Sequence, residues 1–261
     1  MSNISFKHSG NVGDIIYSLP AVRSLLRNKG IEKADYYIQL NVPMGYSGPH
    51  PLGNVLMNEK FFQMLKPLLK SQSFIDKVEI FENQKIDVDL DTFRKVPINP
   101  FTYCIPRWYF LFIVGTNWDL SLPWLEVEKD DRYKDKILVS RNPRLQSQYI
   151  SYKFMEDYAS EIVFVGVEEE FKDFKSVCSK CNEFYQASNF LELAKVLKGS
   201  RFVVANQGLI YTIAESIKIP RLLESNNKAA NNIPIGPNGY DALFQKGFEY
   251  WFNYLRNKNE I

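Results

Sequence analysis

The sequence predicts an α/β protein made of two domains with parallel sheets. Apolar runs of strand length alternate with amphipathic segments of helix length, which is the pattern of repeated βαβ units. Pro123 and the charged run that follows it indicate a linker near residues 122–135. A chain of 261 residues is long for one domain and sufficient for two. We therefore expect two α/β domains that face each other across a cleft.

The first expected domain spans residues 1–125. Its predicted helices are Ala21–Arg27 and Phe61–Leu69, and its predicted strands are Ile4–Lys7, Ala34–Leu40, Lys77–Ile80 and a shorter one near Ile86–Leu90. The stretch Pro43–Leu56 is rich in proline and glycine and predicts a loop. The apolar run Trp108–Val114 has the length of a strand or of a core helix.

The second expected domain spans residues 126–240 and alternates more regularly. Its predicted strands are Lys136–Ser140, Glu161–Gly166, Glu183–Gln186, Arg201–Ala205 and Arg221–Glu224. The helices between them are Tyr152–Ser160, Glu168–Cys178, Phe190–Leu197 and Leu209–Ile217. Residues 241–261 contain a closing helix over about Tyr240–Arg256, whose helical spacing predicts one buried face of Phe244, Phe248, Trp251, Phe252 and Leu255.

Composition excludes several classes of protein. The 45% hydrophobic and 24% charged residues are typical of a globular chain, and a net charge of +2 predicts no stable nucleic-acid partner. No signal peptide is visible, and no apolar run reaches the ~18 residues of a membrane span. With only three cysteines we expect a reducing, cytoplasmic compartment. Cys178 and Cys181 have C-x-x-C spacing without a second ligand pair, which predicts ordinary cysteines and no metal site.

The segment from His8 to Pro20 is the most informative part of the chain. It follows a short strand candidate, contains Gly10 and Gly13, and brings Asp14 to the start of a helix. Glycine lets the backbone approach a ligand closely. We therefore predict a site here. His8 is either a ligand or proton carrier beside Asp14 or a structural residue, and Tyr17 either contacts substrate or faces the core.

Three further loops follow strands of the second half. Asn206, Gln207 and Gly208 precede a helix whose free N–H groups favour a diphosphate, although Asn206 is equally compatible with a simple helix cap. Arg141 and Arg144 suit bidentate phosphate contacts or are solvated arginines. Glu168 suits ribose hydroxyls or simply favours the first turn of a helix. All three loops would meet at the carboxyl edge of one parallel sheet, where such folds bind ligands.

The G-x-G-x-x-G dinucleotide fingerprint is absent, which disfavours a nicotinamide dehydrogenase. Instead, Gly13-Asp14 with Leu19-Pro20 resembles the opening motif of glycosyltransferase family 9, the ADP-heptose lipopolysaccharide heptosyltransferases. Phe164-Val165-Gly166 with Glu168, and the stretch from Val203 to Pro220, resemble the donor-binding domain of that family.

This resemblance implies a GT-B fold, in which two Rossmann-like domains hold a nucleotide-diphospho-sugar and an acceptor without a metal or another cofactor. It gives the acceptor side to the first domain, with Asp14 as general base and with His8, Asn11 and Tyr17 as acceptor or secondary residues. The donor-binding residues that it implies are Gly13, Ser140, Arg141, Arg144, Glu168, Asn206, Gln207 and Gly208.

The chain departs from the family pattern at the donor side. Asn206-Gln207-Gly208 stands where the family has Asp-Thr-Gly, and Tyr211 or Thr212 replaces the histidine that usually follows. Ser140 and the arginines replace phosphate-loop threonines and a lysine. Two other functions therefore stay open: a non-catalytic protein that binds a nucleotide or glycan, and an epimerase or hydrolase on the same architecture.

The acceptor stays open as well. A glycan or another hydroxyl compound fits, with a peripheral membrane contact through the acceptor as one option. Acceptor specificity is expected in Pro43–Leu56 and in the aromatic-rich stretch Phe101–Phe112.

Overall fold

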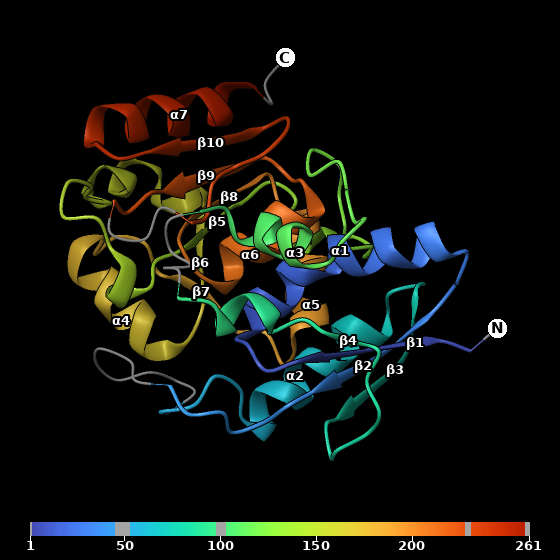
Figure 1. Cartoon of the computed structure of the whole chain (residues 1–261). Coiled ribbons are helices and arrows are strands. Elements are labelled where there is room, and N and C mark those ends of the chain that lie inside the picture. The colour runs from blue at the N-terminus through green and yellow to red at the C-terminus, as the bar shows by residue number, and fades with distance from the viewer. Residues whose placement is uncertain (1, 45–52, 98–102, 228–230, 259–261) are drawn as a thin grey trace. The chain divides into compact units, whose positions relative to one another are not determined.

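The structure is a computed structural model that describes residues 2–44, 53–97, 103–227 and 231–258 (Figure 1). It divides into two compact units, which we describe separately. Unit 1 consists of Met1–Leu120, Trp124–Glu126 and Asn189–Leu191, and unit 2 consists of Ser121–Pro123, Val127–Ser188 and Glu192–Ile261. The predicted division into residues 1–125, 126–240 and 241–261 stays a prediction.

Unit 1 contains a four-stranded parallel sheet in the order β3-β2-β1-β4. Its strands are β1 (Ile4–His8), β2 (Ala34–Ile38), β3 (Ile75–Ile80) and β4 (Val88–Asp89). Its helices are α1 (Val12–Lys29), α2 (Glu59–Lys70), the 3₁₀ helix η1 (Thr92–Lys95) and α3 (Ile105–Phe112).

Unit 2 contains a six-stranded parallel sheet in the order β10-β9-β8-β5-β6-β7. Its strands are β5 (Ile137–Ser140), β6 (Ile162–Val165), β7 (Glu183–Tyr185), β8 (Phe202–Asn206), β9 (Arg221–Glu224) and β10 (Gly239–Ala242). Its α-helices are α4 (Glu168–Val177), α5 (Phe190–Gly199), α6 (Leu209–Ile217) and α7 (Gln245–Lys258). Short 3₁₀ helices occupy Asp131–Tyr133 (η3), Pro143–Leu145 (η4) and Lys153–Glu161 (η5).

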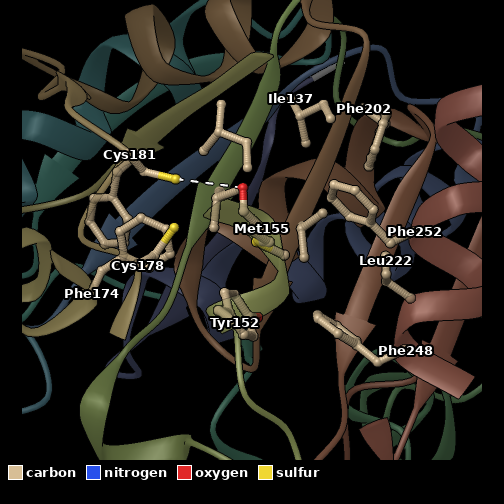
Figure 2. Packing of buried hydrophobic residues seen from close by; sticks show 14 of the residues in the cluster. Ile137, Tyr152, Met155, Phe174, Cys178, Cys181, Phe202, Leu222, Phe248 and Phe252 are labelled. Atoms are coloured by element: carbon tan, nitrogen blue, oxygen red, sulfur yellow. Dashed lines mark hydrogen bonds between the residues drawn. The ribbon is translucent and has the colours of Figure 1, made fainter. Parts of the chain in front are cut away.

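A core of buried aromatic and aliphatic side chains fixes α7 against the sheet of unit 2. Phe248 and Phe252 of α7 are fully buried and pack with Tyr152 and Phe202 (Figure 2). The cysteines of the C-x-x-C pair are free and buried in the same core, with the Sγ of Cys181 3.9 Å from the carbonyl oxygen of Met155. The pair therefore packs in this core like small apolar residues.

The expected α/β class with parallel sheets is confirmed, and several expected elements need correction. Helix α1 starts at Val12, nine residues before the predicted start, and contains Pro20. The segment predicted as a helix over Tyr152–Ser160 is 3₁₀. The closing helix begins at Gln245, because Gly239–Ala242 pairs with β9 as an additional strand. Phe244 therefore precedes the helix, and it is exposed rather than buried.

The run Trp108–Val114 belongs largely to helix α3 and is not a strand. The predicted loop Pro43–Leu56 and the stretch Phe101–Phe112 lie partly outside the described residues.

The strand order of each sheet reverses at one place. In unit 1 the chain runs outward from β1 through β2 to β3 and then places β4 on the other side of β1. In unit 2 it runs from β5 through β6 to β7 and then places β8 on the other side of β5. Open α/β sheets bind ligands at the carboxyl ends of the strands beside such a switch point. The loops after β1 and β4, and after β5 and β8, are therefore the places to search.

Candidate functional site

In unit 1 the two loops at the switch point come together at Asp14. This residue lies in the first turn of α1, and its Oδ2 atom accepts a hydrogen bond of 2.5 Å from Nη2 of Arg94, in η1 just after β4. The side chain of Asp14 is 19% exposed. Burial alone would lower the pKa of Arg94, but the carboxylates of Asp14 and Asp91 hold it above its ordinary value. The result is a partly exposed pair of a carboxylate and a guanidinium.

His8 lies beneath this pair and is fully buried. Its Nδ1 accepts a hydrogen bond of 2.8 Å from the backbone N–H of Gly10, and its Nε2 lies 2.7 Å from the hydroxyl of Tyr109. Burial lowers the pKa of His8 to about 4, although the nearby carboxylate of Asp91 opposes this shift. The imidazole is therefore neutral near pH 7, so the structure favours the structural role over that of a proton carrier.

Gly10 is required at this position by close packing. A Cβ atom built on it would lie 2.5 Å from Cε1 of His8 and 2.7 Å from Nη2 of Arg94. No other residue type therefore fits the loop without moving the side chains that hold Asp14.

The other residues predicted in this loop are Asn11, Gly13 and Tyr17. Asn11 is the N-cap residue of α1, and Gly13 lies in the first helical turn. Tyr17 is buried and its ring lies 6.2 Å from that of Trp124, so it faces the core.

Three residues of this cluster were not predicted: Asp91, Arg94 and Tyr109. Asp91 is buried within 3.7 Å of both His8 and Lys7, and Tyr109 lies on α3. The sequence signal that could have indicated Asp91 and Arg94 is the occurrence of an acid and an arginine directly after the short fourth strand. No pattern distinguishes Tyr109 from its aromatic neighbours.

The low pKa of His8 predicts a stability change below neutral pH. Unfolded histidine has a pKa near 6.5, so between pH 6.5 and 4 the unfolded chain binds the additional proton and stability falls as the pH falls. Relative to His8→Gln, we expect the wild-type chain to lose about 2 kcal/mol more of its unfolding free energy between pH 7 and pH 5. Urea unfolding of both proteins at the two pH values measures this difference. Parallel losses in both proteins would contradict it.

In unit 2 the two loops at the switch point are joined by Asn142 and Asn206. The backbone N–H of Asn142 donates to Oδ1 of Asn206 at 2.8 Å, and Nδ2 of Asn206 donates to the carbonyl oxygen of Asn142 at 2.7 Å. An amide side chain accepts at its oxygen and donates at its nitrogen, whereas a carboxylate can only accept. The asparagine in place of the family's aspartate therefore has a local structural reason.

Replacement of this amide should be costly. In Asn206→Asp, we expect a buried carboxylate oxygen to face the carbonyl oxygen of Asn142, at a cost of about 1–3 kcal/mol in unfolding free energy. Thermal or chemical unfolding measures the loss. A neutral outcome for Asn206→Asp would disprove the reciprocal pair.

The guanidinium of Arg141 has a buried protein partner. Its Nε and Nη2 atoms donate to the two carboxylate oxygens of Glu224 at 2.9 and 2.8 Å, and Nη2 also donates to the carbonyl oxygen of Ile150 at 2.8 Å. Burial would lower the pKa of Arg141, but its hydrogen bonds to Glu224 raise it. Protein groups therefore already engage this guanidinium, and the predicted contact of Arg141 with a diphosphate stays a prediction.

The remaining predicted donor residues occupy different surroundings. Ser140 is buried at the end of β5, and Arg144 is exposed in η4. Glu168 begins α4 and is 66% exposed, with an ion pair of 3.0 Å to Lys172. Its role in ribose binding stays a prediction.

Gln207 and Gly208 lead directly into α6. Gln207 is only 2% exposed, and its Nε2 donates to Oδ1 of Asn231 at 3.3 Å, while its Oε1 has no hydrogen-bond partner among the described residues. A Cβ atom on Gly208 would meet no atom of the described residues within 4 Å, so among these residues the space in front of the first turn of α6 is open. Buried acceptors without partners are rare, and this one is available to a ligand that donates a hydrogen bond.

Within the described ranges, no group of three or more histidine, cysteine, aspartate or glutamate residues could hold a metal ion. None of the helices described is long and apolar enough to cross a membrane.

No protein-family model matches the sequence, and no curated protein does. Solved structures do match the fold. A glycosyltransferase family 9 protein from Veillonella parvula DSM 2008 is 12% identical with a TM-score of 0.61, over 92% of this chain and 86% of that one. Heptosyltransferase WaaC of E. coli, solved with ADP, is 11% identical with a TM-score of 0.64, over 98% and 99% of the two chains.

A third match is TibC, a dodecameric, iron-containing heptosyltransferase solved with ADP-D-β-D-heptose. It is 11% identical with a TM-score of 0.52, over 90% of this chain and 61% of that one. The likeness at these identities concerns the fold, and it confirms the resemblance predicted from the sequence: this chain has the fold of glycosyltransferase family 9 proteins.

Proposed function

We propose that the protein is an inverting, metal-independent glycosyltransferase of GT-B type. It would move a sugar from a nucleotide-diphospho-sugar to a hydroxyl acceptor. The observation that carries this proposal is the partly exposed carboxylate of Asp14, held at one oxygen beside the switch point of its sheet, in a chain with this fold. Within the described residues, the second carboxylate oxygen accepts no hydrogen bond. It is available to a substrate hydroxyl.

In the proposed reaction Asp14 acts as the general base. Its carboxylate accepts the proton of the acceptor hydroxyl while that oxygen forms a bond to the anomeric carbon of the donor sugar. The bond from this carbon to the diphosphate oxygen breaks, and the nucleoside diphosphate leaves with the electron pair. Attack from the face opposite the leaving group inverts the anomeric configuration.

The donor would bind at the carboxyl edge of the sheet of unit 2. The first turn of α6 supplies backbone N–H groups and the positive end of a helix dipole, which together favour a diphosphate. The open space at Gly208 gives a phosphate access to these groups. Oε1 of Gln207 would accept from a hydroxyl of the ligand, with Arg144 and Glu168 as further predicted contacts.

A screen of nucleotide-sugars tests the proposal. We expect one of the ADP-, GDP-, UDP- or CMP-linked sugars to raise the melting temperature by several degrees, because a ligand at 100 times its Kd adds about 2.7 kcal/mol of stability. The shift should be the same with EDTA as with Mg²⁺. If none of the donors shifts the melting temperature, the proposal fails.

The observation that favours a second function, binding without turnover, is the presence of an asparagine at position 206. Its amide is engaged by the backbone of Asn142, where the family resemblance has an aspartate. A binding protein without turnover would give the same thermal shift but release no nucleoside diphosphate over hours with a mixture of free and lipid-linked oligosaccharides as acceptors. Release of nucleoside diphosphate that depends on these acceptors excludes this alternative.

A further inference from the structure

Asp14 is held at two points, its side chain and its main chain, by residues that are distant in sequence. Arg94 donates to its side chain at 2.5 Å, and the hydroxyl of Tyr109 donates to its main-chain carbonyl oxygen at 2.9 Å. These partners come from η1 and α3, so the first turn of α1 is held from two other elements of the same unit.

Hydrogen bonds connect Gly10, His8, Tyr109 and the main chain of Asp14, and we call this chain the Tyr109 arm. The donor and acceptor of each bond follow from one backbone group. The N–H of Gly10 can only donate, so Nδ1 of His8 is the acceptor and the proton of the neutral imidazole lies on Nε2. This proton is donated to the oxygen of Tyr109, which leaves the hydroxyl proton of Tyr109 for the carbonyl oxygen of Asp14. An imidazolium would place a proton on Nδ1 against the N–H of Gly10, in agreement with the low pKa of His8.

The contact between Arg94 and the carboxylate of Asp14, which we call the Arg94 arm, is supported by Asp91. Asp91 is buried, with Oδ1 3.5 Å from Nε of Arg94 and 3.7 Å from Nδ1 of His8, and Oδ2 3.6 Å from Nζ of Lys7. The distances to Arg94 and Lys7 indicate charge attraction rather than short hydrogen bonds, whereas His8 is neutral. Asp91 therefore restrains Arg94 by electrostatics and leaves Nη2 free to contact Asp14.

We propose that Tyr109 and Arg94 are positioning residues for Asp14, with His8 setting the proton direction of Tyr109. This inference rests on the proposed function, in which Asp14 is the base. Tyr109 fixes the main chain of Asp14 and Arg94 fixes its Oδ2 atom, so Oδ1 has one preferred direction. Catalytic groups must be held closely, since a displacement of about 1 Å can reduce turnover ~100-fold.

The test removes one oxygen atom from each of two buried tyrosines. Tyr109→Phe removes the hydrogen bond to the carbonyl oxygen of Asp14. Tyr36→Phe is the matched control, because the hydroxyl of Tyr36 is also buried and also forms a hydrogen bond to α1, with Oγ of Ser18 at 2.8 Å. The probe is release of nucleoside diphosphate from the nucleotide-sugar that gives the largest thermal shift, with mixed oligosaccharides as acceptors. We expect kcat to fall at least ~10-fold in Tyr109→Phe and to stay within about twofold in Tyr36→Phe, with the KM for the donor unchanged in both.

Three further variants distinguish a positioning role from a merely structural one. The side-chain amide of glutamine places a donor near the site of Nε2, whereas asparagine places an acceptor near the site of Nδ1. His8→Gln should therefore retain more turnover than His8→Asn, and this difference should vanish in the Tyr109→Phe background. Arg94→Gln should lower kcat without changing the KM for the donor.

The outcomes separate failure of this inference from failure of the proposed function. Unchanged turnover in Asp14→Asn would overturn the base assignment itself. An inactive Asp14→Asn protein combined with normal kcat in Tyr109→Phe would overturn only the positioning role. Equal losses of kcat in Tyr109→Phe and Tyr36→Phe would do the same, since they would report general destabilisation.

Discussion

Asp14→Asn is expected to lose about 10²–10⁴-fold in kcat while binding the nucleotide-sugar as tightly as the wild-type protein. The amide keeps the size of the carboxylate but accepts no proton from a hydroxyl at neutral pH. Donor binding should persist because the residues proposed for it, apart from Gly13, lie in unit 2, whereas Asp14 belongs to unit 1. Steady-state release of nucleoside diphosphate gives kcat, and a thermal-shift titration gives donor affinity.

A second acidic residue of unit 1 provides the control. Asp35, on β2, accepts a hydrogen bond from Asn3 and lies 3.7 Å from Lys77, away from the Asp14 cluster. Asp35→Asn also removes one carboxylate charge from the unit, and it should leave kcat within about twofold. Equal turnover in both variants and the wild-type protein would show that Asp14 is not the base.

The largest expected effect on stability is at Glu224. This residue is fully buried on β9, accepts two hydrogen bonds from Arg141 and a third, of 2.6 Å, from the backbone N–H of Ser147. Glu224→Leu would leave the guanidinium of Arg141 buried without a counter-charge. We expect a loss of about 3–5 kcal/mol in unfolding free energy, measured by urea or thermal unfolding.

A double-mutant cycle shows whether the pair is the cause. Removal of both charges, in Arg141→Met with Glu224→Leu, should be less destabilising than Glu224→Leu alone, because the uncompensated charge is gone. If the two single losses simply add in the double variant, then Arg141 and Glu224 do not act as a pair.

Local patterns in the sequence predicted the strands and loops of the sheets well. The residues of each loop motif are contiguous in the sequence: glycine and an acid before a helix at the end of β1, and Asn-Gln-Gly at the end of β8. Their position at the carboxyl edge therefore follows from the alternation of strands and helices. Helix α6 and strand β9 have the predicted bounds. Strand β10 was missed because Gly239-Tyr240-Asp241-Ala242 has no strand pattern and is extended through pairing with β9.

The partners of the site residues could not be predicted for a physical reason. Arg94 meets Asp14 across 80 residues of chain, and Tyr109 meets it across 95. Arg141 and Glu224 are separated by 83 residues. Which basic or aromatic side chain reaches a given carboxylate depends on tertiary packing, and no spacing in one sequence contains that information. The sequence therefore indicated Asp14 but not the residues that hold it.

The same contacts bear on two of the predicted roles. A pair of arginines after a buried strand suggested phosphate binding, yet one of them completes a buried ion pair with a strand that follows much later. His8, predicted as a ligand or a structural residue, is neutral and fully buried. In both cases the surroundings of the side chain depend on its burial, which its residue type does not reveal.

The anomeric configuration of the product tests the central claim most directly. Proton NMR of a reaction with an anomerically pure nucleotide-sugar follows the anomeric signal of the donor and that of the new glycoside. We expect the donor signal to disappear in step with a product of the opposite configuration, with and without EDTA, and with no such product in Asp14→Asn. A product that retains the donor configuration, or a donor that binds and is never consumed, would contradict the account.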